Sequence, residues 1–156
     1  MKSVVLATII TTATLAGCSS VPMESKETAN TAKEFNAPSQ DTAGIYVYRK
    51  DTFAGAALKK DVWIGKDCVG QTAKGVFFYK EVPGNEKLEI STESEFSPNM
   101  LTINAKNGEL YFVEQFLKIG AFVGGADLEL ANTATGKSEV LRLGMAKGGN
   151  CDSVLK

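Results

Sequence analysis

The chain has 156 residues, of which 17 are basic and 18 acidic, so its net charge at neutral pH is close to zero. Because no basic stripe stands out, the sequence argues against nucleic-acid binding and against electrostatic binding to a membrane. It contains no histidine, which excludes Ser-His-Asp and Cys-His catalysis and nearly all common zinc sites. We therefore expect a non-enzymatic protein with no catalytic residue, no cofactor and no bound metal.

The N-terminus has the pattern of a bacterial secretion signal. Lys2 supplies a positive charge, and residues 4–16 form an apolar run that is too short to span a bilayer as a permanent helix. This run ends in Leu15-Ala16-Gly17-Cys18, which resembles the lipobox of bacterial lipoproteins. The alternative is an ordinary secretory signal that happens to contain a cysteine.

The lipoprotein resemblance implies both a location and an anchor. Residues 1–17 would be a signal peptide that is cleaved, and Cys18 would carry diacylglycerol and an acylated amino terminus. Lipid transfer of this kind needs the nucleophilic sulfur of a cysteine. The residue after Cys18 is Ser19 and not an aspartate. The absence of aspartate at this position resembles the sorting pattern of outer-membrane lipoproteins. We expect a lipid-anchored protein of the cell envelope that faces the periplasm and binds an unidentified envelope protein.

Residues 18–42 are expected to be the lipidated cysteine and a flexible tether. The segment after Cys18 is rich in Ser, Thr, Ala, Asn and Glu and contains two prolines. Such a composition cannot bury enough apolar surface to offset the entropy of ordering, and a tether of this length spans roughly 25–30 Å. The alternative is a transient helix from Met23 to Phe35, which no repeated apolar face supports.

Residues 43–146 have the pattern of one all-β domain, followed by a C-terminal tail at residues 147–156. Short β-type runs alternate with Gly, Pro, Asn and Asp, which predicts an antiparallel β-sandwich of about seven to nine strands or a small barrel. The expected strands are residues 45–48, 61–65, 68–70, 75–79, 88–91, 100–105, 109–114 and 127–130. Residues 138–143 fit either an edge strand or a short helix that Ser138 caps.

Two local patterns make sharper predictions within this domain. Asn107-Gly108 separates two alternating apolar runs, which is the strongest hairpin signal in the chain. With a period of two, Phe77 and Tyr79 share one face of their strand and Phe78 takes the other. Aromatic residues on both faces predict a strand that is covered on both sides.

Cys68 and Cys151 form an even pair once Cys18 is assigned to lipid. In an oxidising compartment such a pair predicts one disulfide. The alternative is two separate thiols, because Cys151 lies in a glycine-containing tail.

The remaining motifs are weak. Thr135-Gly136-Lys137-Ser138 resembles the end of a phosphate-binding loop, but the upstream glycine of that loop is missing, so we expect a solvent-exposed turn. The acidic side chains that could pair for acid–base chemistry are expected to be solvated; they include Glu89 and Glu93. Possible contact residues are Phe122 and Val123, in a glycine-spaced stretch, and Glu95 and Phe96.

Several glycine, proline and aromatic positions resemble the DUF2846 family of small bacterial envelope domains. The resemblance rests on Ile45-Tyr46-Val47-Tyr48-Arg49, on Val62-x-Ile64-Gly65-Lys66, on Gly75-x-Phe77 with Val82-Pro83-Gly84, on Tyr111-Phe112-Val113 and on Gly124-Gly125. It implies a β-sandwich akin to PEGA and prealbumin-like modules, and it implies no reaction.

The functional expectation is therefore a non-enzymatic, membrane-anchored protein that binds another envelope protein or assists assembly. One alternative is an inhibitor of a periplasmic enzyme such as lysozyme, which would need a protruding loop such as residues 93–96. A remote alternative is a hydrolase that uses carboxylates alone, with two acidic side chains in one cleft.

Overall fold

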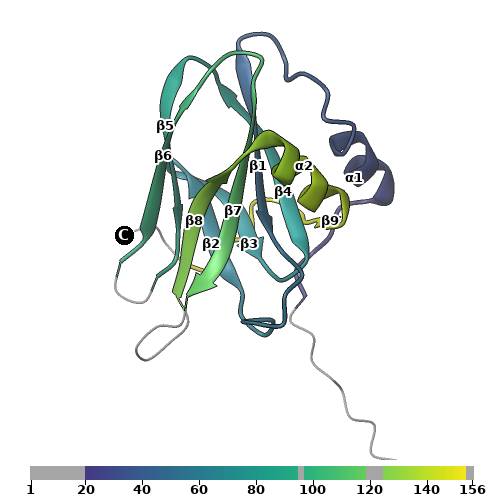
Figure 1. Ribbon diagram of the computed structural model, residues 1–156. Coiled ribbons are helices and arrows are strands. Elements are labelled where there is room, and N and C mark those ends of the chain that lie inside the picture. The colour runs from purple at the N-terminus through teal and green to yellow at the C-terminus, as the bar shows by residue number, and fades with distance from the viewer. Residues whose placement is uncertain (1–19, 95–96, 119–124, 154–156) are drawn as a thin grey trace, which may run out of the picture.

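A computed structural model describes residues 20–94, 97–118 and 125–153, and within them it contains two β-sheets and two helices (Figure 1). One sheet has five strands in the order β8-β7-β1-β4-β9, and the other has four in the order β3-β2-β5-β6. The elements are α1 (Lys26–Ala32), β1 (Thr42–Arg49), β2 (Lys60–Ile64), β3 (Asp67–Thr72), β4 (Val76–Pro83), β5 (Glu86–Thr92), β6 (Asn99–Ala105), β7 (Leu110–Lys118), β8 (Gly125–Ala131), α2 (Thr133–Leu141) and β9 (Gly144–Met145). The predicted β-sandwich is confirmed.

Strand β1 is the centre of the fold because both of its faces are apolar. Ile45 and Val47 point into the core between the two sheets, whereas Tyr46 and Tyr48 belong to a second cluster on the opposite face. All four side chains are at most 2% exposed. The alternation of β4 agrees with the prediction, since Phe78 lies in the first cluster and its two aromatic neighbours lie in the second. The five-stranded sheet is therefore covered on both faces.

The predicted hairpin at Asn107-Gly108 is wrong, although the turn exists. β6 pairs with β5 in one sheet, and β7 pairs with β1 and β8 in the other, so the turn carries the chain between sheets. Gly108 has φ +78° and its N–H donates to the carbonyl of Thr42 at 2.8 Å. The β1–β7 and β4–β9 pairs are parallel, so the five-stranded sheet is mixed rather than antiparallel. Turn residues fix a local reversal but do not choose the strand that each run pairs with.

The two helices form a third layer over the outer face of the five-stranded sheet (Figure 1). α2 resolves the ambiguous residues 138–143 in favour of a helix, but its N-cap is Asn132, whose side chain accepts from the N–H of Thr135 at 2.9 Å. The expected turn at residues 135–138 is wrong because these residues lie inside α2. Gly136 and Val140 are buried against the sheet, and this tertiary contact selects the helix.

Residues 20–42, for which the sequence predicted a flexible tether, are instead packed on the domain. Val21 is 7% exposed and belongs to the core between the sheets. The next residues continue the edge of the sheet: Met23 forms a bridge with Ala146, and the N–H of Glu24 donates to the carbonyl of Met145 at 2.9 Å. Composition failed here because main-chain pairing with β9 and a few apolar contacts, rather than an apolar face, order the segment.

Helix α1 then begins at a regular cap. The hydroxyl of Ser25 accepts a hydrogen bond from the N–H of Thr28 at 3.2 Å. No residue of α1 is fully buried, so the helix depends on its flanks for its position. One such flank is Phe35, whose ring meets Phe112 edge-on at 5.8 Å.

The predicted disulfide joins Cys68 of β3 to Cys151. It holds the C-terminal segment against the four-stranded sheet. The Cα atoms of the two cysteines are 6.1 Å apart, which is within the usual range for a disulfide. The N–H and hydroxyl of Ser153 both donate to a carboxylate oxygen of Asp61 at 2.8 Å, and Asp61 is fully buried. Gln71 donates to Asp152 at 2.9 Å. Within the described residues, neither helix is long and apolar enough to cross a membrane.

Candidate functional site

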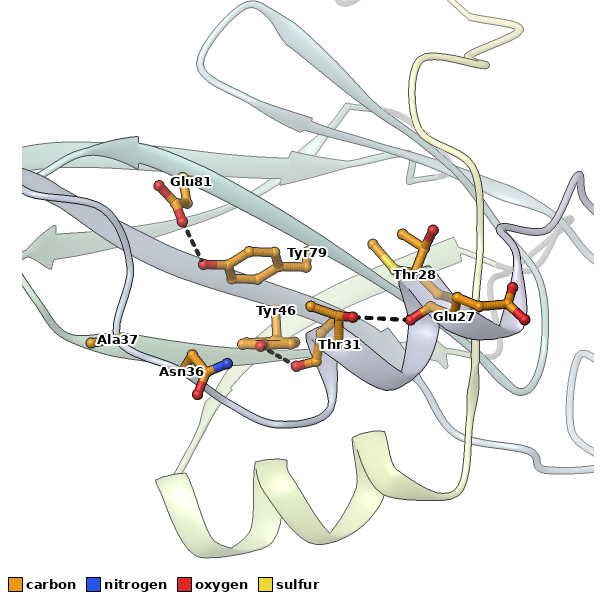
Figure 2. Close-up of a pocket in the computed structure, with 10 residues that line it drawn as sticks. Glu27, Thr28, Thr31, Asn36, Ala37, Tyr46, Tyr79 and Glu81 are labelled. Atoms are coloured by element: carbon orange, nitrogen blue, oxygen red, sulfur yellow. Dashed lines mark hydrogen bonds between the residues drawn. The ribbon is translucent and has the colours of Figure 1, made fainter.

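A cleft of about 530 Å³ opens between helix α1 and the outer face of β1 and β4 (Figure 2). This volume is in the range of small-ligand and side-chain binding sites. The cleft is lined by Glu27, Thr28, Thr31, Ala32, Asn36, Ala37, Tyr46, Tyr79, Glu81 and Met145. It exists because α1 packs on the sheet at a few points only.

Two tyrosines form the floor of this α1 cleft. Tyr46 and Tyr79 are direct neighbours in the β1–β4 register, and their ring centroids are 4.7 Å apart. The ring of Tyr46 also stacks on Phe112 at 4.9 Å with an interplanar angle of 9°. Its hydroxyl donates to the carbonyl of Ala32 at 2.6 Å, which ties the C-terminal end of α1 to the sheet. The floor is therefore a fixed aromatic surface.

The carboxylate of Glu81 is held at one end of the cleft by three donors. It accepts from the Tyr79 hydroxyl at 3.0 Å, from the Thr42 hydroxyl at 3.1 Å and from the Ser39 N–H at 3.2 Å. Hydrogen bonds from Ser39, followed by those from the two hydroxyls, keep the pKa of Glu81 below its usual value. The cleft therefore holds a fixed negative charge at neutral pH, on the carboxylate that Figure 2 shows bonded to the Tyr79 hydroxyl.

The tyrosine hydroxyls stay protonated over the physiological range. Burial raises the pKa of Tyr46 to about 12, and burial together with the Glu81 carboxylate raises the pKa of Tyr79. Hydrogen bonding to its own main chain and to Ser25 lowers the pKa of Glu27, the second acidic residue of the lining. The described lining contains no lysine or arginine, so its charge and its aromatic floor favour a ligand that carries a positive charge next to an apolar group.

The hydroxyl of Tyr46 gives a direct test of how α1 is held. We expect Tyr46→Phe to lower the free energy of unfolding by about 1 kcal/mol, because the ring keeps its packing while the carbonyl of Ala32 loses the shorter of its two hydrogen bonds. Urea unfolding followed by circular dichroism measures this change. Tyr111→Phe is the matched control, since its hydroxyl bridges main-chain groups at an exposed turn, where water replaces the lost bonds. Equal losses in the two variants would contradict the role given to Tyr46.

Several predicted site residues lie outside the described part of the chain. They are Leu15, Ala16, Gly17 and Cys18 of the lipobox and the contact candidates Glu95, Phe96, Phe122 and Val123. Among the described acidic residues, Glu89 is exposed as predicted, and Glu93 accepts a hydrogen bond from the N–H of Asp61 at 3.0 Å. The described residues also contain no group of three or more acidic or cysteine side chains placed to hold a metal.

Sequence reasoning missed the α1 cleft. Strand alternation placed Tyr79 on one face with Phe77, but the β1–β4 pairing that brings Tyr46 beside Tyr79 depends on contacts between distant segments. The wall of the cleft was missed because α1 belongs to the segment that composition assigned to a tether. The helix considered as an alternative for residues 23–35 exists as α1, and its local signals are the Ser25 cap and the acidic Glu27 in the first turn.

The geometry defines a class of protein: a disulfide-bonded β-sandwich with a helical outer layer and a small acidic, aromatic cleft. Residues 39–126 match the family model described as "Protein of unknown function (DUF2846)", and the chain belongs to this family. It is also similar to a protein of Haemophilus influenzae described as "Uncharacterized protein", with 47% identity over 132 residues that cover 85% of this chain and 77% of the relative. No solved structure matches the chain.

Proposed function

We propose that the protein is a non-enzymatic lipoprotein of the bacterial envelope, anchored through Cys18 to the outer membrane on its periplasmic side, and that it binds a segment of another envelope protein in the α1 cleft. The lipobox and the preceding apolar run support the anchor. The observation that carries the binding role is the cleft itself, with its fixed tyrosine floor and the Glu81 carboxylate at one end.

The chemistry of the cleft favours binding over catalysis. Hydrolysis by a carboxylate pair needs one carboxyl group that stays protonated near neutral pH and donates its proton to the leaving group. Both acidic residues of the lining have their pKa lowered rather than raised, so each is a carboxylate that accepts hydrogen bonds. A basic or amphipathic peptide segment fits such a site, with its cation near Glu81 and its apolar part against the partly exposed ring of Tyr79.

The binding role is tested by site-specific photo-crosslinking in cells. A photoreactive amino acid at Thr31, on the exposed rim of the cleft, is expected to trap one defined partner, and mass spectrometry then identifies the partner segment. The matched control is the same amino acid at Ser138, which is exposed on the solvent side of α2. Identical sets of trapped proteins from both positions would argue against a binding site in the cleft.

The trapped partner then allows a direct measurement of affinity. We expect Thr31→Arg to weaken binding of the purified partner about tenfold or more, because a bulky cation on the rim of the cleft narrows the cleft and repels a positively charged ligand. Ser138→Arg makes the same change on α2 and should leave the dissociation constant unaltered. Unchanged affinity in Thr31→Arg would contradict the proposal.

A further inference from the structure

The loop between β1 and β2 has an exposed apolar apex. Residues 52–58 carry no charge and read Thr-Phe-Ala-Gly-Ala-Ala-Leu. Phe53 is 97% exposed, the highest value among the exposed large hydrophobic side chains of the described chain, and Leu58 is 37% exposed. Lys59 and Lys60 follow directly. An aromatic apex beside basic residues is typical of segments that lie in a lipid–water interface.

Hydrogen bonds within the protein fix the main chain of this loop. The guanidinium of Arg49 is 3% exposed and donates to the carbonyls of Gly55 at 2.5 Å and Leu58 at 2.8 Å. Two further main-chain bonds close the turn, from Ala56 to Phe53 at 3.1 Å and from Leu58 to Gly55 at 2.9 Å. Pairing of these groups matters where water is scarce, because an unpaired main-chain group in lipid is costly.

Gly55 fixes how the loop sits on the domain. Its φ is +69°, and an added Cβ would overlap the side chain of Leu117 in β7. The loop therefore packs closely on the sheet below it while Phe53 projects away from the protein. The ring of Phe53 therefore makes almost no contact with the rest of the domain.

The packing of Val21 places the domain close to the membrane. If Cys18 is lipidated, only three residue steps separate the anchor from a side chain in the core, which is at most about 11 Å of extended chain. Figure 1 shows that the described chain begins at the same end of the molecule as the connection between β1 and β2. The membrane-facing end of the domain is therefore the end that carries Phe53.

We propose that the β1–β2 loop docks on the lipid surface, with Phe53 inserted among the headgroups and Lys59 next to anionic phosphates. The partner is a glycerophospholipid membrane that contains anionic lipid. The lipid anchor supplies a high local concentration, so that one aromatic side chain is enough to orient the domain. This inference rests on the lipoprotein function proposed above.

The test uses the full mature protein in vesicles of phosphatidylglycerol and brominated phosphatidylcholine. In Phe53→Trp, the added tryptophan emission is expected to shift to shorter wavelength and to be largely lost by bromine quenching. The parent protein supplies the baseline, since its single tryptophan, Trp63, is 4% exposed. The control is Lys106→Trp in the β6–β7 turn, next to the start of β1 and so at the opposite end of that strand; its emission should not be quenched.

Each outcome is decisive. Quenching of Phe53→Trp alone supports the docked loop. Absence of quenching in both variants, or equal quenching in both, overturns it. Intact-mass measurement of the same samples reports separately whether Cys18 carries lipid. A protein without lipid contradicts the proposed anchor, whereas a lipidated Phe53→Trp variant whose added emission is not quenched contradicts only the docking of the loop.

Discussion

Replacing both Cys68 and Cys151 by alanine is expected to lower the free energy of unfolding by about 4 kcal/mol. The disulfide joins residues 83 positions apart, so in the unfolded chain it closes a long loop and removes much conformational freedom. In the chain-entropy model, loss of the bridge restores that freedom to the unfolded state. The measurement is urea unfolding of the two proteins at equal concentration, with the slope compared as well as the midpoint.

The native state should survive without the bridge. The tail keeps its bonds from Ser153 to the buried Asp61 and from Gln71 to Asp152, and Val69 still accepts from the N–H of Gly149 at 3.0 Å. Reduction of the parent protein is the control and should give the same loss as the double substitution. A loss below about 1 kcal/mol in both experiments would show that the unfolded chain gains little freedom.

Local alternation accounts for what was predictable in this fold. β1 is buried on both faces, and its sequence shows this directly, because Ile45, Tyr46, Val47 and Tyr48 are all apolar or aromatic. The burial of β4 on both faces could be predicted in the same way, since its aromatic residues divide between the two faces. These patterns depend on neighbouring residues of one strand, so they can be extracted without knowledge of the partners.

Partner choice was not predictable, because it depends on contacts between distant segments. The Asn107-Gly108 turn has hairpin chemistry, yet β7 lies parallel to β1 in the other sheet. β1 needs an apolar neighbour on each edge, and β7 supplies one through residues such as Val113, which is fully buried. That requirement of the whole sheet outweighs the local preference of a two-residue turn.

The candidate site likewise has one part that the sequence indicated and one part that it did not. The tyrosine floor belongs to strands that the sequence indicated, whereas the wall comes from a polar helix with no fully buried residue. The polar composition of this segment indicates that it cannot fold alone, and the structure agrees, because α1 has no fully buried residue. Composition does not reveal that Val21 and Phe35 are anchored in clusters formed by the rest of the chain.

Gly136→Leu is expected to lower the free energy of unfolding by about 3 kcal/mol. Glycine inside a helix normally costs about 1 kcal/mol relative to alanine, so propensity alone predicts the opposite sign. Here an added Cβ would overlap the Cβ and Cγ atoms of Phe112. Phe112 cannot move aside, because it is 1% exposed and is stacked on Tyr46. Helix α2 must therefore lift from the sheet, and urea unfolding should show the loss.

Two further variants separate steric overlap from helix propensity. Ser138→Ala changes an exposed residue of the same helix and should shift stability by no more than about 0.5 kcal/mol. Gly136→Ala adds only the Cβ, so it gains propensity but meets the same overlap, and we expect a net loss of about 1 kcal/mol. A gain in Gly136→Ala would contradict the close packing of α2 on Phe112. In that case α2 would lie farther from the sheet than the burial of Gly136 and Val140 indicates, and the third layer of the fold would contribute less to stability.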